Sequence, residues 1–240
     1  MHFDIRRANQ RGPGSLTTEY QHANPDALLI KICGITTGDD ARLAAEAGAD
    51  ALGFIFVEGT PRYVTPGRAA AIIAALPPFV TPVGVFRDHP VAHIHAVAAE
   101  CRLGAVQLHG AEPPETVATL RWPVLKTVKV AGPEDLAQLD RYEPAAFLLD
   151  SPVRWSEGEA RTPISWTLAR EAGQRARVIL SAGLTADTVA EAIRVAQPFG
   201  VDVDSGVEAA PGRKDPVKVR RFVHAAREAA LALTAGSERP

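Results

Sequence analysis

The sequence predicts an α/β fold, the (β/α)8 barrel also called the TIM barrel, in a single domain. Eight short apolar segments, rich in β-branched residues or leucine, begin about 19 to 32 residues apart. Alanine-rich stretches lie between them, and their apolar residues recur at three- and four-residue steps, which is the helical period. Strands that alternate with helices through short loops favour right-handed βαβ crossovers and a parallel sheet.

The predicted elements follow one another in strict alternation. The strands cover residues 28–33, 51–56, 79–86, 104–109, 123–128, 145–150, 177–182 and 199–204. The helices cover residues 39–48, 67–76, 91–101, 114–121, 133–140, 164–173, 185–196 and 215–234. Pro77 and Pro78 interrupt the charge-free run from Ala69 to Phe86. We therefore interpret this run as a helix end followed by a strand, and not as a membrane span.

A doubly wound open sheet is the competing architecture, but it usually needs only about five or six strands. Eight strand–helix units in about 210 residues close more naturally into a barrel. No Gly-x-Gly-x-x-Gly sequence follows the first strand, which removes the best evidence for a dinucleotide-binding fold. Residues 1–27 carry no hydrophobic period. We expect them to form a flexible extension, with the barrel spanning residues 28–235.

Composition and charge exclude several classes of protein. The 26 basic and 28 acidic residues give a net charge of −2, which offers no electrostatic footprint for nucleic acid. A hydrophobic content of 46% excludes wholesale disorder. The N-terminus lacks the apolar run of a secretory signal. Two cysteines could form one bridge, but they provide no disulfide framework and no zinc site. We expect a cytoplasmic protein without nucleic-acid or membrane partners.

Two residues at predicted strand ends are candidates for proton transfer, because barrel active sites lie at the carboxyl ends of the strands. Cys33 follows the first strand and precedes a helix that begins near Thr37. The amino end of that helix would lower the pKa of the thiol, although a buried thiol without function is equally compatible with the position. Asp150 ends an apolar strand, where burial favours a proton donor over a simple structural cap.

The loops after the seventh and eighth strands predict a phosphate site. Gly183 precedes a predicted helix, and Ser205 and Gly206 follow the last strand beside Asp202. These loops are where many barrels hold phosphate with backbone N–H groups. Ordinary helix caps and tight turns are the alternative interpretation. Together the two loops favour a small phosphorylated substrate.

Other polar residues near the predicted mouth give weaker signals. Arg62 follows Pro61 in the loop after the second strand and could bind a carboxylate, or it could be a solvated loop arginine. His109 faces the mouth. His93 and His95 lie two residues apart on a helix and cannot chelate one ion together.

At these residues the chain resembles the phosphoribosylanthranilate isomerase family of tryptophan biosynthesis, an isomerase family of aromatic amino-acid biosynthesis. The first and last of the matching segments are the most specific, and together they span the chain from Leu28 onward. The segments are Lys31-Ile-Cys-Gly-Ile-Thr36, Gly48-Ala-Asp-Ala-Leu-Gly-Phe54, Pro61-Arg-Tyr63, Val83-Gly-Val-Phe86, Val106-Gln-Leu-His-Gly110, Leu148-Leu-Asp150, Ala182-Gly-Leu184, Asp202-Val-Asp-Ser-Gly-Val-Glu208 and Pro211-Gly-Arg-Lys-Asp-Pro216.

The resemblance implies an Amadori rearrangement of N-(5'-phosphoribosyl)anthranilate to 1-(2-carboxyphenylamino)-1-deoxyribulose 5-phosphate, without a cofactor or metal. It implies that Asp150 is the general acid and Cys33 the general base. Arg62 would hold the anthranilate carboxylate, and Asp202 would lie close to the sugar hydroxyls. The resemblance also assigns the phosphate to amides around Gly183, Ser205 and Gly206. Members of the family occur as monomers and homodimers.

The sequence departs from the family pattern in three places. The loop Ser156–Trp166 is slightly longer than usual and has a single glycine. Ala182 stands where a glycine is common, and Asp204 stands where a serine is frequent. An extra anion at Asp204 would weaken phosphate binding unless its side chain points away.

Two alternative functions fit the same barrel. One is an isomerase of histidine synthesis, which uses a pair of aspartates where this chain has Cys33 in the first position. The other is a non-catalytic barrel that only binds phosphorylated metabolites. Turnover of phosphoribosylanthranilate separates the proposed isomerase from both.

Overall fold

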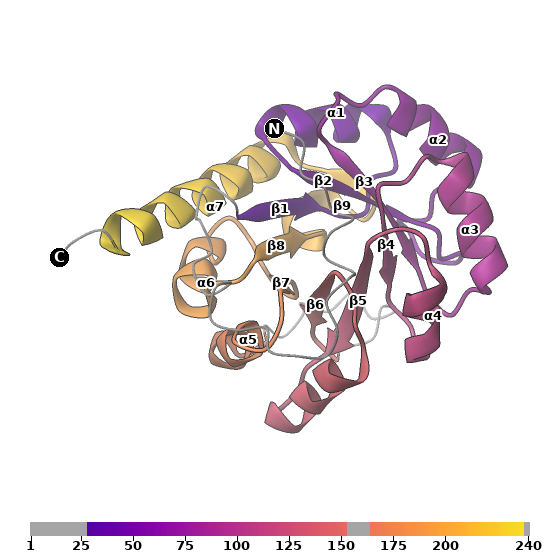
Figure 1. Cartoon of the computed structure of the whole chain (residues 1–240). Coiled ribbons are helices and arrows are strands. Elements are labelled where there is room, and N and C mark those ends of the chain that lie inside the picture. The colour runs from indigo at the N-terminus through magenta and orange to yellow at the C-terminus, as the bar shows by residue number, and fades with distance from the viewer. Residues whose placement is uncertain (1–27, 153–163, 238–240) are drawn as a thin grey trace.

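Eight parallel strands close into a ring in the computed structural model, which describes residues 28–152 and 164–237 (Figure 1). The strands follow one another around the ring in sequence order. They are β1 (Leu29–Ile32), β2 (Ala51–Ile55), β3 (Thr81–Phe86), β4 (Ala105–Leu108), β5 (Val124–Lys129), β6 (Ala146–Asp150), β7 (Val178–Leu180) and β8 (Gly200–Val203). Pairing of β1 with β8, in register from Leu29 opposite Gly200 to Ile32 opposite Val203, closes the ring. The predicted barrel is confirmed, and the open sheet is excluded.

Helices cover the outside of the ring (Figure 1). The α-helices are α1 (Gly38–Ala47), α2 (Pro66–Ala74), α3 (Val91–Glu100), α4 (Pro114–Thr119), α5 (Trp166–Gly173), α6 (Val189–Ala196) and α7 (Pro216–Ser237). Their boundaries lie close to the predicted ones because the local signals are strong. Thr37 and Thr65 cap α1 and α2 through their side chains, and Pro66 at the start of α2 needs no N–H partner.

Three features differ from the predicted pattern. The segment after β5 forms a 3-10 helix, η3 (Pro133–Arg141), in place of an α-helix. After β8, a short 3-10 turn, η4 (Ser205–Val207), leads into an antiparallel hairpin of β9 (Glu208–Ala210) and β10 (Arg213–Lys214). The hairpin places two charged side chains, Glu208 and Lys214, near the mouth of the barrel. Its strands are too short to produce a clear period in the sequence.

The barrel interior is apolar at one end and polar at the other. Toward the amino ends of the strands, Ala51, Val83 and Ala105 form one buried cluster, and Ala146 belongs to a second cluster. A larger apolar layer lies between the sheet and the surrounding helices. Side chains alternate between the two faces of each strand, so every second residue points into the barrel. Near the carboxyl ends of the strands, these inward-facing residues include the polar ones.

Several sequence-based expectations lie outside the described residues. These are the predicted extension 1–27 and most of the loop Ser156–Trp166. Within the described parts of the chain, none of the helices combines the length and the hydropathy that a membrane crossing needs. Both cysteines, Cys33 and Cys101, are free thiols, so the single bridge that the sequence allowed is absent.

Candidate active site

A cavity lies at the carboxyl ends of the strands, the end where barrel enzymes hold their active sites. Side chains from both halves of the barrel line it. They are Cys33, Val85, Gln107, His109, Leu148, Asp150, Ser181, Asp202 and Asp204. Two residues that the sequence predicts for proton transfer, Cys33 and Asp150, therefore face the same space from different sides of the ring.

Cys33 is held by the last strand of the barrel and by small neighbours. Its backbone N–H donates to the carbonyl of Val203 over 2.8 Å. Its side chain is 5% exposed and packs with Ile55 and Val85. Gly53 faces it closely, because a Cβ atom at that position would lie 2.6 Å from the sulfur. Glycine at position 53 therefore makes the room that the thiol occupies.

The expected lowering of the Cys33 pKa is wrong. Burial raises the pKa of this thiol to about 11, although the nearby ammonium of Lys31 opposes the shift. The helix that was expected to stabilise the thiolate begins only at Gly38, five residues further along the chain. Since the field of a helix end falls off within its first turn, the helix does not offset the cost of burial.

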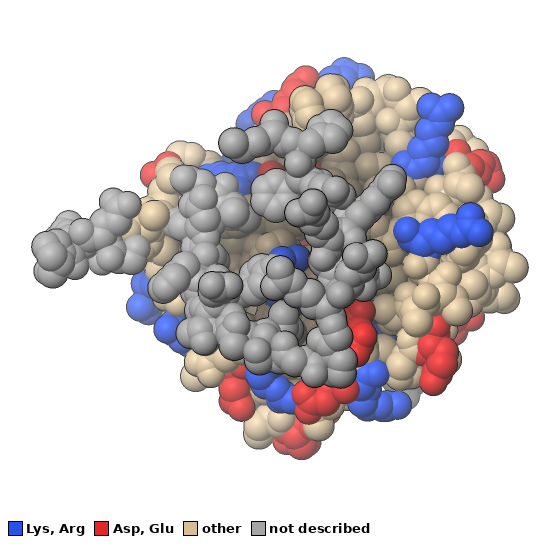
Figure 2. Space-filling view, in the orientation of Figure 1, with Lys and Arg blue, Asp and Glu red and all other residues tan. Residues whose placement is uncertain are grey.

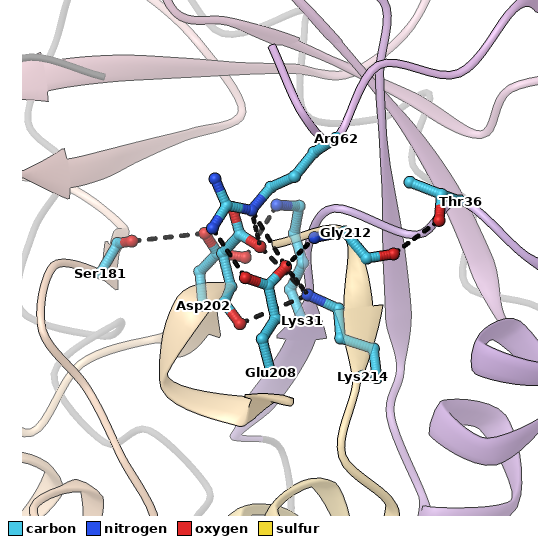
Figure 3. A network of polar contacts seen from close by, with 9 residues as sticks. Lys31, Thr36, Arg62, Ser181, Asp202, Glu208, Gly212 and Lys214 are labelled. Atoms are coloured by element: carbon cyan, nitrogen blue, oxygen red, sulfur yellow. Dashed lines mark hydrogen bonds and ion pairs between the residues drawn. The ribbon is translucent and has the colours of Figure 1, made fainter. Parts of the chain in front are cut away.

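Lys31, which was not predicted as a site residue, is fully buried inside the barrel at 0% exposure. Its ammonium binds the carboxylate of Asp202 over 2.8 Å, and Ser181 donates to the other oxygen of that carboxylate over 3.3 Å (Figure 3). Burial alone would lower the pKa of Lys31, but Asp202 and the Cys33 side chain outweigh it and the pKa lies above its ordinary value. Lysine at an inward-facing position, two residues before Cys33, is the signal that could have revealed it.

Asp150 is anchored through both carboxylate oxygens. The backbone N–H of Ser151 donates to Oδ1 over 2.9 Å, and Nε2 of His109 lies 3.4 Å from Oδ2. The other ring nitrogen of His109 lies 3.4 Å from both the Gln107 amide and the Thr127 hydroxyl. Asp150 is 3% exposed, so these neighbours fix the direction of its carboxyl group beside the cavity.

Behind His109, a second polar cluster stabilises the loop after β4. Glu112 is buried and accepts hydrogen bonds from the backbone N–H groups of Asp88 and Gly110. Lys126 of β5 binds Glu112 over 2.7 Å. Burial would raise the pKa of Glu112, but Lys126 and the Asp88 N–H hold it below its ordinary value. This pair could not be predicted from the sequence, because its members belong to different units of the barrel.

Arg62 comes to lie in a cluster of four charges beside the cavity (Figure 3). Its Nε and Nη2 atoms donate to the two oxygens of Glu208 over 3.0 and 2.7 Å. Its Nε atom also lies 3.0 Å from Asp204 Oδ1. Lys214 binds both carboxylates, over 3.0 Å to Asp204 and 3.2 Å to Glu208. Arg62 is thus a fixed guanidinium with internal counter-ions, and not a solvated loop arginine.

The two carboxylates of this four-charge cluster differ in their proton affinity. For Glu208, burial is outweighed by Arg62 and Lys214, which lower the pKa to about 2. For Asp204, burial dominates and the neighbouring Glu208 adds to it, so its pKa is raised despite Lys214 and Arg62. The Asp204 side chain contacts both cations, Arg62 and Lys214. The cluster thus contains two positive and two negative groups.

The loops after β7 and β8 lie against each other at the mouth of the barrel. Gly183 adopts a left-handed conformation with φ of 70°. Gly206 approaches the other loop so closely that a Cβ atom there would lie 1.9 Å from the carbonyl oxygen of Leu184. Ser205 is exposed at the start of η4. Asp202, which is also predicted to contact the substrate, accepts a hydrogen bond from Lys31 through one carboxylate oxygen.

Charges of both signs are visible around the edge of the face in Figure 2, where Lys and Arg side chains are interspersed with Asp and Glu. No group of three or more His, Cys, Asp or Glu side chains in the described part of the chain is arranged to hold a metal ion. The charged groups that do converge are the lysine, arginine and carboxylate side chains around the cavity.

Comparison with known proteins identifies relatives along most of the chain. Residues 30–225 match the family model described as N-(5'-phosphoribosyl)anthranilate (PRA) isomerase. A protein of that name from Pelobacter propionicus is 48% identical over 201 residues, which cover 84% of this chain and 96% of the relative. One from Geobacter metallireducens is 47% identical over 200 residues, covering 83% of this chain and 99% of the relative.

Solved structures agree with the sequence comparison. The crystal structure of phosphoribosyl anthranilate isomerase from Thermotoga maritima has a TM-score of 0.80 and 40% identity, covering 84% of this chain and 99% of that one. Another structure of this enzyme, in complex with reduced 1-(o-carboxyphenylamino)-1-deoxyribulose 5-phosphate, has a TM-score of 0.77, with 40% identity and the same coverage. The family model, the close relatives and the shared barrel lead to one conclusion: this chain belongs to the N-(5'-phosphoribosyl)anthranilate isomerase family.

Proposed function

We propose that this chain isomerises N-(5'-phosphoribosyl)anthranilate to 1-(2-carboxyphenylamino)-1-deoxyribulose 5-phosphate, a step of tryptophan biosynthesis. The observation that carries the proposal is the shared cavity, which brings the Cys33 thiol and the Asp150 carboxyl group to the same space. One group can accept a proton and the other can donate one, as an Amadori rearrangement requires. The family to which the chain belongs supports the assignment.

In the first step, Asp150 gives its proton to the ring oxygen of the ribose. The bond between this oxygen and C1 breaks, and the nitrogen lone pair forms a C1=N iminium. The backbone N–H of Ser151 and the imidazole of His109 support the carboxylate that remains. Because these donors are already in place, charge develops on Asp150 in a prepared environment.

In the second step, the thiolate of Cys33 removes the proton from C2. The electron pair forms the C1=C2 bond, and the nitrogen becomes neutral. The enolamine then becomes the ketone as C1 gains a proton and the C2 hydroxyl loses one. Lys31 lies beside the sulfur and supplies positive charge to the thiolate. Every proton that leaves one atom is taken up by another, so the scheme needs no cofactor.

Substrate binding would use two groups of residues around the mouth of the barrel. Arg62 would hold the anthranilate carboxylate through the charge of its guanidinium, next to the Glu208 carboxylate that accepts its Nε and Nη2 hydrogen bonds. The backbone around Gly183, Ser205 and Gly206 would hold the phosphate, which suits the close contact between these loops. Asp202 would contact the sugar hydroxyls through the oxygen that does not bind Lys31.

The test is the turnover of Cys33→Ala and Asp150→Ala, followed as the loss of substrate fluorescence. Each change should lower kcat by roughly 10²- to 10⁴-fold, the usual contribution of a positioned acid or base, while circular dichroism shows an intact fold. Cys101→Ala and Asp140→Ala are matched controls, since Cys101 lies on the outer side of the sheet and Asp140 is exposed. If the kcat of Cys33→Ala or Asp150→Ala stays within tenfold of the wild-type value, the role of that residue is refuted. If the wild-type protein binds the substrate but does not turn it over, the chain is a binding protein.

The same proposal extends to the setting of the enzyme. We infer a cytoplasmic location, in keeping with two unpaired cysteines. Small phosphorylated substrates would be its partners, with no nucleic acid or membrane. We propose that the enzyme acts as a monomer or a homodimer. We also propose that residues 28–235 form the complete catalytic barrel.

A further inference from the structure

Asp204 stands between the cavity and the arginine that is proposed to bind substrate. Its side chain lines the cavity, whereas Arg62 is not among the described residues that line it. Asp204 Oδ1 lies 3.0 Å from Arg62 Nε, and both side chains are only 12% exposed. A ligand in the cavity therefore meets the Asp204 carboxylate where it would need the guanidinium.

The two carboxylates on Arg62 are bound unequally. Glu208 engages two nitrogens of the guanidinium and also accepts the backbone N–H of Gly212 over 3.1 Å. Asp204 forms an ion pair at Nε, the nitrogen whose N–H is donated to Glu208. The pKa values agree with this difference in binding. Burial raises the pKa of Asp204, whereas the pKa of Glu208 is lowered to about 2. Glu208 is thus the fixed counter-ion, and Asp204 is the one that can leave.

We propose that Asp204 is an internal competitor of the substrate: in the free enzyme it occupies the place on Arg62 that the anthranilate carboxylate takes, and the substrate must displace it. The inference rests on the proposed function of this site. A carboxylate that is displaced from a partly buried guanidinium opposes binding by the free energy of that contact. Asp204 is therefore a residue that sets the affinity for carboxylate-bearing substrates.

Nearby groups allow the displacement without leaving Asp204 unpaired. The Lys214 ammonium lies 3.0 Å from Asp204 Oδ1 and 3.3 Å from the Asp204 carbonyl oxygen. Lys214 can therefore remain paired with the Asp204 carboxylate after that carboxylate leaves Arg62. The backbone N–H of Val207 donates to the carbonyl of Asp204 over 3.3 Å, so Asp204 is the N-cap residue of η4. A phosphate on Ser205 and Gly206 would bind this same turn. The two anionic ends of the substrate thus act on neighbouring residues.

The test compares wild type with Asp204→Asn, which keeps the shape of the side chain and removes its charge. The KM for N-(5'-phosphoribosyl)anthranilate should fall by about tenfold, and kcat should change by less than about twofold, because Asp204 opposes binding and touches no reacting atom. Binding of reduced 1-(o-carboxyphenylamino)-1-deoxyribulose 5-phosphate, measured by calorimetry, should tighten by a similar factor. Asp140→Asn removes the same charge from an exposed ion pair and should change neither value.

A second ligand separates competition for Arg62 from a general charge effect. The same reduced compound with phenyl in place of carboxyphenyl should bind wild type and Asp204→Asn equally. Equal tightening for both ligands, or an unchanged or higher KM in the variant, would overturn the inference.

A crystal structure of wild type with the reduced carboxyphenyl compound gives an answer that does not depend on a folded variant. The ligand carboxylate should replace Asp204 beside the Arg62 guanidinium. Persistence of the Arg62–Asp204 contact in that complex would overturn the inference while leaving the proposed function intact. Failure of wild type to turn over the substrate would instead refute the proposed function itself.

Discussion

At the scale of single residues, the thiol of Cys33 shows two opposing effects of its surroundings. Burial raises its pKa to about 11, and the ammonium of Lys31 limits the rise. At neutral pH the group is therefore mostly protonated in the free enzyme. A thiolate formed in this place is a strong base, because it regains a proton readily. We infer that catalysis depends on the small thiolate fraction that Lys31 supports.

The raised pKa predicts how alkylation of Cys33 depends on pH. Since only the thiolate reacts, the rate constant for iodoacetamide should rise about tenfold per pH unit from about pH 7 to about pH 10. Mass spectrometry of the Cys101→Ala variant would follow Cys33 alone. Glutathione, measured in parallel, should level off near its own lower pKa. A rate for Cys33 that is already constant above about pH 8 would contradict the raised pKa.

Some site residues can be predicted from sequence and others cannot, for a physical reason. Cys33 and Asp150 end apolar segments, so the barrel rule alone brings them to the mouth. Lys31 lies within a strand and is stabilised there by Asp202, which is 171 positions away. Glu208 reaches Arg62 from 146 positions away. Pairing at such separations depends on the closed ring, which leaves no local pattern in the sequence.

At the scale of elements, the loops after β7 and β8 form one unit. Gly206 lies against the carbonyl oxygen of Leu184, and the η4 turn begins beside it. The approach is possible only without a side chain at position 206. Because both loops are proposed to donate to the phosphate, their separation sets the geometry of that site.

Gly206→Ala should therefore damage phosphate binding. The new methyl group would push the two loops apart, and we expect KM to rise by roughly tenfold or more, since small misplacements at a site are costly. Inhibition by inorganic phosphate should weaken in parallel. Gly67→Ala is the matched control, because a Cβ atom there meets nothing within 4 Å. An unchanged KM in Gly206→Ala would show that the contact does not shape the substrate site.

The eight strands and most helices could be predicted because their local signals agree with the fold. The segment 133–140 has a helical period, but in the structure it is a 3-10 helix. A hydrophobic pattern with a period of three to four residues fits an α-helix and a 3-10 helix about equally, so the sequence alone could not separate the two forms. The β9–β10 hairpin escaped prediction because Arg213 and Lys214 make up one entire strand.

At the scale of the whole molecule, the last helix holds the first strand in place. Arg227 of α7 donates to the carbonyl of Leu28 over 2.6 Å and to Asp50 over 2.8 Å. Asp50 in turn accepts the backbone N–H of Ile30 over 2.7 Å. Helix α7 also packs on α1 and α6, and it runs past β1 in Figure 1. The two ends of the described chain are thus joined where the ring closes.

Arg227→Met should weaken this closure. The change removes hydrogen bonds to a carboxylate and to backbone carbonyls, worth about 1–3 kcal/mol. A chain of this size should then melt roughly 3–9 °C lower in a thermal scan followed by circular dichroism. Arg221→Met, on the same helix, breaks an exposed pair with Asp187 and should shift Tm far less. Equal shifts in the two variants would show that α7 does not secure the ring.

The Lys31–Asp202 pair has a consequence for a nascent chain. The lysine is synthesised early, and the aspartate that makes its burial tolerable belongs to the last strand of the ring. Until β8 packs beside β1, burial of β1 in an apolar interior would leave the Lys31 ammonium without a counter-ion. We therefore expect an incomplete polypeptide that lacks β8 not to form a stable, inactive half-barrel.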